Sequence, residues 1–419
     1  MADVRPLRAL HYDLDRTGGL QPVAAPPYDV IDEGQRGELF ARSPYNVVAI
    51  DLPRDPTGGD PYAHAAATLD TWRHEGVLVR DEEPALWALE QDYTGPDGQR
   101  RTRRGFLARV RVEDYGPGRV RPHERTHPGP KEDRLRLTRA TGANLSPIFA
   151  LYDDPHEAAY GALASHVARS EPWGELTDDD GTVHRLWRIA DPQAADAVHA
   201  ALAGAELLIA DGHHRYETAR LHARETGDPA DEWVLMCLVA LQDPGLTVFP
   251  THRLLTDLDE ARRAALERVL ERDFTVADVE PDALEPTGDG PVRMGHLDAR
   301  ARRPRMLTLR DPAIAAAALP GKPDAYRQLD TAVLEALVLR GALGMSDDDI
   351  SHLRGLDYAR DAEQARARVE LGDAEAAFFM RATPVEQVRA VAASGASMPP
   401  KSTYFFPKVL TGLLMNLLD

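Results

Sequence analysis

Residues Glu206–Arg220 read ELLIADGHHRYETAR, and this stretch decides the fold around it. Its apolar residues, Leu207 to Ala210, predict a short buried strand. Asp211 and Gly212 end that strand, and the residues from His214 to Arg224 have the composition of a helix. We therefore predict a strand, a glycine turn and a helix in direct succession. Gly212 tolerates a positive φ at such a turn and lets a ligand approach the backbone.

The predicted turn has the chemistry of a phosphate-binding site. The first amides of a helix have no acceptor within the helix and lie at the positive end of its dipole, so they attract anions. Arg215 adds a guanidinium that can bind phosphate through two N–H groups, and His213 and His214 add further donors. Asp211 can accept a proton or hold Mg²⁺ through oxygen. In the alternative interpretation, Asp211 only caps the helix and the histidines are surface residues.

Residues Asp211–Arg215, DGHHR, resemble the phosphate-binding G-x-H-R turn of the ParB/sulfiredoxin superfamily; we call them the DGHHR box. The box is most similar to that of the free serine kinases of this superfamily, which phosphorylate serine to phosphoserine. The resemblance covers the box with its flanking strand and helix. It implies that the phosphates of a nucleotide, ADP or ATP, bind at Gly212–Arg215, with Mg²⁺ at Asp211.

Residues Arg121–Arg134, RPHERTHPGPKEDR, form a second candidate site. This segment carries the candidate base Glu124 and the candidate substrate-binding residues His123, Arg125, Lys131 and Arg134. HERTH matches the zinc motif H-E-x-x-H, with His127 as the second histidine, but that motif needs a helix, which the prolines that follow disfavour. We therefore expect a loop that offers one carboxylate and several cations to a phosphorylated or carboxylated small molecule, and no zinc. A solvated charged loop is the alternative.

Two further segments hold candidate ligand-binding residues. In Met398–Lys408, MPPKSTYFFPK, the residues Lys401, Ser402 and Thr403 resemble the end of a P-loop without its glycines, so this is not a Walker motif. We expect these three residues to bind phosphate; the alternative is a structural turn before a helix over 409–418. In AAPPYD, two prolines precede Asp29, which either faces a ligand or caps the helix that starts near Asp32.

Taken in order, AAPPYDV, HERT…PKEDR, ADGHHRYETA and MPPKSTYFFPK resemble the hallmark segments of a bacterial and archaeal family, the domain of unknown function 1015. This resemblance spans nearly the whole chain, from about Arg5 to Leu414. It brings no established reaction, but it implies that the four segments serve one pocket. We therefore predict that the three cationic segments, around Glu124, the DGHHR box and Lys401, converge.

Composition limits the partners. The 49 Lys and Arg residues against 68 Asp and Glu residues give a net charge of −19, so attraction to nucleic acid or to an anionic bilayer is not expected. The absence of a long apolar stretch and of a signal-peptide core predicts a cytoplasmic protein without a membrane segment. The single cysteine, Cys237, excludes a disulfide framework and a multi-thiolate metal site, and its apolar surroundings predict a buried, inert thiol. The oligomeric state stays open.

Segments of period two and period 3.6 alternate along the chain, which predicts an α+β, mixed α/β fold. With the resemblance above, we expect a ParB/sulfiredoxin-like phosphate-binding core and a C-terminal α/β domain. The expected regions are 1–150 with the HERT loop, 151–256 with the DGHHR box, and 257–419 ending in MPPKSTYFFPK. Helices are expected over 63–74, 192–205, 258–273, 330–342, 360–370 and 384–393, and strands over 85–93, 103–112, 146–152, 183–189 and 233–241.

These patterns predict a small-molecule phosphotransferase, and the resemblance to the free serine kinases implies that it acts on free serine and a nucleotide, or that it runs the reverse reaction as a phosphoserine phosphatase. Phosphoryl transfer depends on positioning and charge neutralisation, which a cation-rich pocket with one carboxylate supplies. Glu124 would take the hydroxyl proton, and Asp211 and His213 are the other catalytic candidates. Two alternatives stay open: a non-catalytic nucleotide or phosphometabolite-binding regulator of the ParB-like class, and a hydrolase in which His213 or Asp211 attacks phosphorus.

Overall fold

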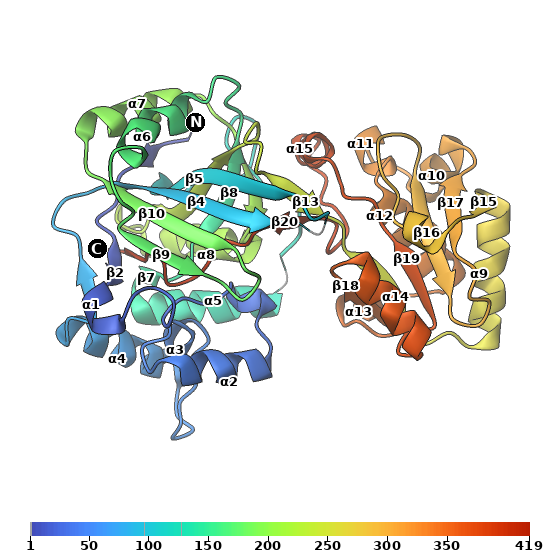
Figure 1. Ribbon diagram of the computed structural model, residues 1–419, viewed down its shortest axis with the longest axis horizontal. Helices are drawn as coiled ribbons and strands as arrows, with labels where there is room; N and C mark the ends of the chain where they lie inside the picture. The colour runs from blue at the N-terminus through green and yellow to red at the C-terminus, as the bar shows by residue number, and fades with distance from the viewer. Residues whose placement is uncertain (1, 96, 127) are drawn as a thin grey trace. The chain divides into compact units, whose positions relative to one another are not determined.

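The computed structural model describes residues 2–95, 97–126 and 128–419, and its contacts divide the chain into two compact units (Figure 1). Unit 1 comprises the chain up to Pro122, Thr126–Thr247 and Pro407–Asp419, and unit 2 comprises His123–Arg125 and Val248–Phe406. The expected region boundary lies between residues 256 and 257, and the contacts change unit at Val248. Two short segments therefore belong to a different unit from the residues that precede them in the chain: His123–Arg125 to unit 2, and Pro407–Asp419 to unit 1.

Unit 1 is built on a large mixed sheet. Its strands are β1 (Val4–Arg5), β4 (Leu86–Thr94), β5 (Arg100–Arg111), β6 (Val120–Arg121), β8 (Ile148–Tyr152), β9 (Gly174–Thr177), β10 (Val183–Ile189), β11 (Leu207–Asp211) and β12 (Trp233–Ala240). They lie in the order β6-β11-β8-β12-β5-β4-β10-β9, and β1 pairs with β5. The pairs β6–β11 and β8–β12 are parallel, and β4 and β5 form an antiparallel hairpin.

Two helices cover one face of this sheet; the helix that starts at Pro192 was expected from its sequence, and the one that starts at Ala158 was not. Helices α6 (Ala158–Val167) and α7 (Pro192–Leu202) contribute Leu163 and Val198 to a core that also contains Phe106 and Ile148 from the strands. Each such side chain is fully buried, which stabilises the fold by about 1.5–3 kcal/mol per residue. Helix α8 (His213–Thr226) adds Tyr216 to the same core.

The helix α5 (Pro128–Thr141) corrects one expectation. Lys131 and Arg134 were expected on a loop because prolines surround them, but both lie within α5. Proline is tolerated in the first turn of a helix, where the amide that it lacks would have no partner, so Pro128 and Pro130 begin this helix. The HERT residues 123–126 lie outside helices and strands, as expected.

The remaining elements of unit 1 form a layer with α5. They are β2 (Leu10–Tyr12), α1 (Leu14–Thr17), the 3-10 turn η1 (Tyr28–Val30), α2 (Glu33–Arg42), α3 (Val48–Asp51), α4 (Pro61–His74), β3 (Leu78–Arg80), β7 (Ala143–Asn144) and β21 (Asn416–Leu417). Helix α4 contacts α5, and α5 in turn contacts α8. This layer brings the N-terminal segments and α5 to the neighbourhood of the DGHHR box.

The end of the chain corrects a second expectation. The predicted helix over 409–418 is absent from the described structure, and the segment pairs with distant strands instead. Thr411 bonds to Ala25, Met415 bonds to Leu10, and β21 pairs with β7. Gly412 has a φ of +88°, which interrupts any helix, and the neighbouring leucines are buried. Tertiary pairing therefore outweighs the local helix composition.

Unit 2 is a smaller antiparallel sheet with helices on both faces. Its strands, in spatial order, are β15 (Phe274–Asp278), β17 (Arg305–Leu309), β16 (Arg293–Asp298), β19 (Ala376–Phe379), β14 (His252–Leu255) and β18 (Leu356–Ala359). Phe378 and Phe379 are adjacent on β19, so they enter the two separate cores on opposite faces. One core includes Leu266 and Val338, and the other includes Val369.

The four helical regions expected in unit 2 are present, and three short helices over 312–318, 324–327 and 347–351 were not predicted. The helices of this unit are α9 (Glu260–Asp273), α10 (Pro312–Ala318), α11 (Asp324–Arg327), α12 (Asp330–Val333), the π-helix η3 (Leu334–Ala342), α13 (Asp347–Ser351), α14 (Ala362–Leu371) and α15 (Val385–Ala393), beside the 3-10 turn η2 (Pro281–Ala283). A further ladder joins β13 (Thr247–Phe249) to β20 (Tyr404–Phe406). The fold is therefore mixed α/β, as predicted.

None of the helices in the described ranges combines the length and apolar character that crossing a bilayer requires.

Candidate functional site

The DGHHR box lies at a strand-to-helix turn, as the sequence predicted. Strand β11 ends at Asp211, Gly212 has a φ of +91°, and α8 begins at His213. Residues Leu207–Ala210 are buried, which fixes the end of the strand in the sheet. His213 is also buried, and Gly212, the residue at the N-cap, has no side chain with which to cap the helix. The first amides of α8 are therefore positioned by a rigid strand and a left-handed glycine.

Asp211 lies between two cations. Its Oδ1 accepts a hydrogen bond from Lys408 Nζ at 2.6 Å, and its Oδ2 accepts one from Arg215 Nη2 at 2.6 Å. Burial raises the pKa of the Asp211 carboxyl, but Lys408 and Arg215 lower it by more, so its pKa lies below the ordinary value. Asp211 is therefore ionised at neutral pH, and it organises two cations at the start of α8.

Arg215 is tied to the protein as well as to Asp211. Its Nη1 donates to Ser146 Oγ at 2.9 Å and to the Pro147 carbonyl oxygen. Its side chain is only 8% exposed, and Nε has no hydrogen-bond partner among the described atoms. The guanidinium is thus rigidly placed, and its bonds to Asp211 and Ser146 compete with the two-pronged phosphate contact that the sequence suggested.

A third cation lies beneath the box. Arg103 on β5 is 1% exposed, lies over the Phe149 ring at 4.4 Å, and donates from Nε to Gln91 Oε1 at 3.0 Å. Burial lowers the pKa of the guanidinium to about 10, and Asp211 is among the carboxylates close enough to oppose that shift. Arg103 therefore stays charged at neutral pH, although no ion pair of the described residues includes it.

Arg134 connects two further candidate segments, AAPPYD and PKEDR, to the surroundings of the box. Its Nη1 donates to Asp51 Oδ1 at 3.0 Å, and its guanidinium lies over the Tyr28 ring at 4.2 Å. Burial raises the pKa of Asp51, and both Arg134 and Arg215 are near enough to counter this. The segments AAPPYD, PKEDR and DGHHR thus meet within unit 1, where Arg134 binds an internal carboxylate.

Asp29 and Lys131 flank this group. Asp29 is exposed in η1, and Asp32 rather than Asp29 caps α2, so the capping interpretation of Asp29 was wrong. Lys131 is partly buried in α5, and its carbonyl oxygen accepts a bond from Thr218 on α8. A cavity of about 40 Å³ lies among Asp51, Arg134, Ser146 and Arg215, too small for a nucleotide.

The other predicted residues lie in unit 2, where the HERT and KST segments meet. His123 is buried, its Nε2 is 2.8 Å from Thr403 Oγ1, and its carbonyl oxygen accepts a bond from the Met398 amide. Arg125 is exposed. Glu124 is close enough to the buried Arg253 to raise the pKa of that guanidinium, although burial lowers it overall.

Arg253 also supports the Lys401–Thr403 turn. Its Nη2 donates to the carbonyl oxygens of Pro400 and Lys401 at 3.1 and 3.0 Å. Lys401 is exposed with a φ of +56°, whereas Ser402 is buried and donates to the Pro399 carbonyl at 2.7 Å. The hydroxyl of Ser402 therefore stabilises the turn, which leaves Lys401 as the exposed cation of this segment.

The structure gives the proposed Mg²⁺ site little support. Both oxygens of Asp211 are bonded to cations, which a metal ion would have to displace. No group of three metal-binding side chains occurs in the part of the chain that the structure describes. The zinc motif cannot be judged from its second histidine, because His127 lies outside the described residues.

Sequence reasoning missed Arg103, Asp51 and Ser146. A signal for Arg103 exists in the strand pattern, since alternation from Leu107 and Gly105 places it on the same buried face, opposite Gln91. Asp51 and Ser146 gave no such signal, because their roles depend on helices α5 and α8 that approach them only in the folded chain.

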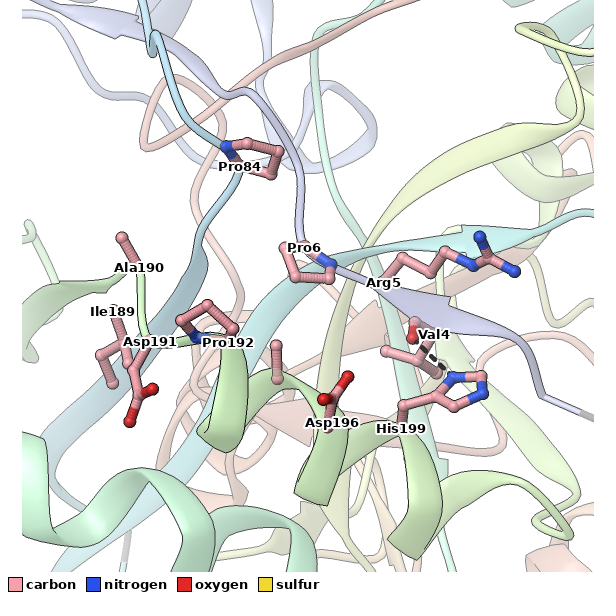
Figure 2. A pocket seen from close by; sticks show the side chains of 11 residues that line it. Val4, Arg5, Pro6, Pro84, Ile189, Ala190, Asp191, Pro192, Asp196 and His199 are labelled. Atoms are coloured by element: carbon pink, nitrogen blue, oxygen red, sulfur yellow. Dashed lines mark hydrogen bonds between the residues drawn. The ribbon is translucent and has the colours of Figure 1, made fainter.

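Another hollow of unit 1, with a volume of about 410 Å³, lies away from these residues. Figure 2 shows its apolar walls, Pro6, Pro84 and Pro192, and His199, whose Nδ1 donates to the Val4 carbonyl oxygen. Its polar side chains Arg5, Asp196 and His199 are exposed to solvent, so they do not form a buried binding site. None of the described residues that line it was predicted as a site residue.

Comparison with known proteins gives a family but no close relative. The family model described as "Protein of unknown function (DUF1015)" matches residues 4–332. No curated protein matches the chain.

Several solved structures resemble the chain at low identity. A conserved hypothetical protein from Pyrococcus furiosus is 16% identical over 70% of this chain and 92% of its own, with a TM-score of 0.35. A free serine kinase in complex with AMP is 15% identical over 68% and 83%, with a TM-score of 0.36. SbnI from Staphylococcus aureus, truncated at its C-terminus, is 11% identical over 73% and 85%, with a TM-score of 0.37. Likenesses this weak do not extend a ligand or activity to this chain.

Proposed function

The chain belongs to the DUF1015 family, and from that premise we propose that it binds the phosphate groups of a nucleotide at the DGHHR box and acts as a small-molecule phosphotransferase. The nucleotide is ADP or ATP, and the acceptor is free serine. In the reverse direction, the same site would remove phosphate from phosphoserine. The serine assignment rests on the motif resemblance of the box alone.

One observation carries the phosphate proposal: Asp211 is paired with two cations at the start of a long helix, and a third cation, Arg103, is buried close enough to interact with it electrostatically. Lys408 and Arg215 both bind Asp211, and Arg103 lies buried beside them with its Nη1 unpartnered among the described atoms. Buried charge without a counter-ion is unfavourable by several kcal/mol. A phosphate group at the amides of α8 would supply the missing negative charge, so the site is most favourable when an anion is bound.

The other predicted residues keep their proposed roles. Glu124 is the candidate base for the acceptor hydroxyl, with His213 as a further catalytic candidate. Lys401 is a candidate phosphate ligand, and Thr403 is another, although its Oγ1 is bonded to His123. Arg125, Lys131 and Asp29 are candidate substrate ligands. Arg134, His123 and Ser402 are bonded to internal partners, so we assign them a supporting role in holding these segments.

A second function is favoured by the state of Asp211. Because both of its oxygens are bonded to cations, Asp211 is a poor proton acceptor and a poor nucleophile. A nucleotide or phosphometabolite-binding regulator needs the same cations but no base. Binding without turnover in the presence of serine would support this alternative.

A titration panel tests the proposal. The full chain is titrated calorimetrically with ADP, ATP, CTP, pyrophosphate and phosphoserine, each with and without Mg²⁺. We expect saturable binding of at least one nucleotide and of pyrophosphate, and weaker binding in Lys408→Met. Lys322→Met, which removes a lysine outside the box, is the matched control. Failure of every phosphate compound to bind would refute the proposal.

Turnover is tested separately by measuring phosphoserine formed from serine and ATP. Glu124→Gln should abolish turnover and leave nucleotide affinity within about twofold, because only the proton acceptor is removed. Equal turnover in this variant would show that Glu124 is not the base.

A further inference from the structure

Gln91 on β4 is a buried amide with a fully determined orientation. Arg103 donates to its Oε1 through both Nε and Nη2. A guanidinium can only donate, so the atom facing it must be the amide oxygen and the other terminal atom must be the NH₂ group. That NH₂ group donates to the Lys408 carbonyl oxygen at 3.0 Å and to His184 Nδ1 at 3.1 Å. Every polar atom of this side chain therefore has a partner.

His184 fixes the same arrangement from the neighbouring strand β10. Because Nδ1 accepts from Gln91, the proton of the neutral ring is on Nε2, which donates to Asp178 Oδ2 at 2.8 Å. His184 has no exposed surface, and burial lowers its pKa. Asp178, His184, Gln91 and Arg103 thus form one continuous network across three strands of the sheet.

The network ends at Lys408, a residue outside the helices and strands. Lys408 lies in a segment that is neither helix nor strand, so no ladder fixes its backbone. The bond from Gln91 joins this backbone directly to the centre of the sheet. The same residue presents its ammonium group to Asp211, one of the two carboxylate contacts that define the DGHHR box.

We propose that Gln91 is a positioning residue, which fixes the Lys408 backbone so that the Lys408 ammonium is held at the DGHHR box for an incoming phosphate group. The inference rests on the proposed phosphate site. Gln91 itself touches no ligand, and Arg103 and His184 act by fixing its orientation. Replacement of Gln91 would leave Lys408 in the chain, but the Lys408 ammonium would no longer be held in one position. The affinity for phosphate would then fall, because binding would have to restrict the mobile lysine again.

A double-mutant cycle on the full chain tests this proposal. Pyrophosphate affinity is measured calorimetrically for the wild type, Gln91→Met, Lys408→Met and the double variant, with thermal unfolding followed in parallel. We expect Gln91→Met to weaken binding by about fivefold to tenfold, the effect of one lost hydrogen bond, and Lys408→Met by at least as much. In the double variant we expect no further loss beyond Lys408→Met, because Gln91 acts only through Lys408.

Two variants guard against a purely structural effect. Tyr93→Phe removes the bond to the Gly245 carbonyl from the same strand and face, and should lower the unfolding midpoint without changing affinity. Gln91→Glu retains the acceptor that Arg103 needs but cannot donate to Lys408, so it tests the same bond if Gln91→Met does not fold. Its added charge is controlled by repeating the change in the Lys408→Met background.

The outcomes separate the two claims. If wild type binds pyrophosphate and Lys408→Met weakens it, but the Gln91 variants bind like wild type, the positioning role is refuted while the phosphate site stands. Additive losses in the double variant also refute it, because Gln91 would then act by another route. If wild type does not bind pyrophosphate, the proposed function fails first.

Discussion

Arg215 holds the DGHHR box together and is also its proposed phosphate ligand. Its guanidinium bonds to Asp211 and Ser146, so the bare protein already uses the donors that a phosphate would need. A bound phosphate could share Nη2 with Asp211 or replace it, while Lys408 continues to neutralise the carboxylate. The strength of the Arg215 contribution is therefore a sensitive measure of how the box works.

We expect Arg215→Ala to weaken pyrophosphate binding by about 1.5–3 kcal/mol, the range for a hydrogen bond to a charged group. The change also leaves Asp211 with one cation instead of two, so the free energy of unfolding should fall as well. Calorimetric titration and urea denaturation measure the two effects. Arg188→Ala, which removes a different ion pair of the same sheet, should reduce stability alone. Unchanged affinity in Arg215→Ala would exclude the residue from the site.

The reactivity of the buried Cys237 thiol reports whether strand β12 opens to solvent. Burial raises the pKa of its thiol to about 12, against about 8.5 for an exposed thiol. At pH 8 only a negligible fraction of the Cys237 thiol is therefore in the reactive thiolate form, and this fraction becomes large only as the pH approaches the raised pKa. We expect the folded protein to resist a thiol-specific reagent at pH 8 and the urea-unfolded chain to react fully. Rapid labelling of the folded chain would show that β12 opens readily.

At the scale of elements, the turn between β11 and α8 depends on one glycine. Gly212 has a φ of +91°, and a Cβ at this position would lie 3.0 Å from the guanidinium carbon of Arg215. Gly212→Ala combines backbone strain of about 1–2 kcal/mol with a displacement of Arg215. We expect lower stability in urea denaturation and weaker pyrophosphate binding in the same variant. Gly204→Ala, at a glycine without a positive φ or a close neighbour, is the control.

The sequence predicted elements well where a local pattern determines them. The strand, glycine turn and helix of the box follow from apolar run, glycine and helix composition, and the structure agrees. The helix at Pro128 and the extended chain end were mispredicted because their outcome depends on context. A proline ends a helix when it lies in the interior but is tolerated in the first turn, so its effect depends on where the helix starts. Residues 409–418 pair with segments that are far away in the sequence.

The site was predictable only in part, for the same reason. His213, His214 and Arg215 could be identified because strand, turn and helix are contiguous. Arg103 and Asp51 could not be assigned to the site, because each reaches it from an element that is distant in sequence. The predicted convergence of the three cationic segments stays a prediction, although the HERT and KST segments meet through His123 and Thr403.

At the scale of the molecule, the chain end is structurally part of the first unit. Pro407–Asp419 supplies Lys408 to the box and buries Leu413, Leu414 and Met415 completely. Each buried side chain contributes about 1.5–3 kcal/mol, and a whole domain is stable by only about 5–15 kcal/mol. The last residues are therefore needed for the fold of unit 1 as well as for its proposed chemistry.

Deletion of residues 407–419 should accordingly prevent unit 1 from folding cooperatively. We expect the truncated chain to lose the unfolding transition of unit 1 in a thermal melt followed by circular dichroism. A chain carrying only Lys408→Met is the comparison, because it lacks the ammonium and keeps the apolar residues, so it should fold. A truncated chain with an unchanged melt would show that the buried end segment is dispensable.

The central claim is that the DGHHR box binds phosphate, and a crystal structure of the full chain soaked with ADP tests it most directly. We predict electron density for a phosphate group at the amides of Gly212–Arg215, with an oxygen within about 3.2 Å of Lys408 Nζ. ADP bound with its phosphates elsewhere, or a box that stays empty at saturating ADP, would contradict the claim.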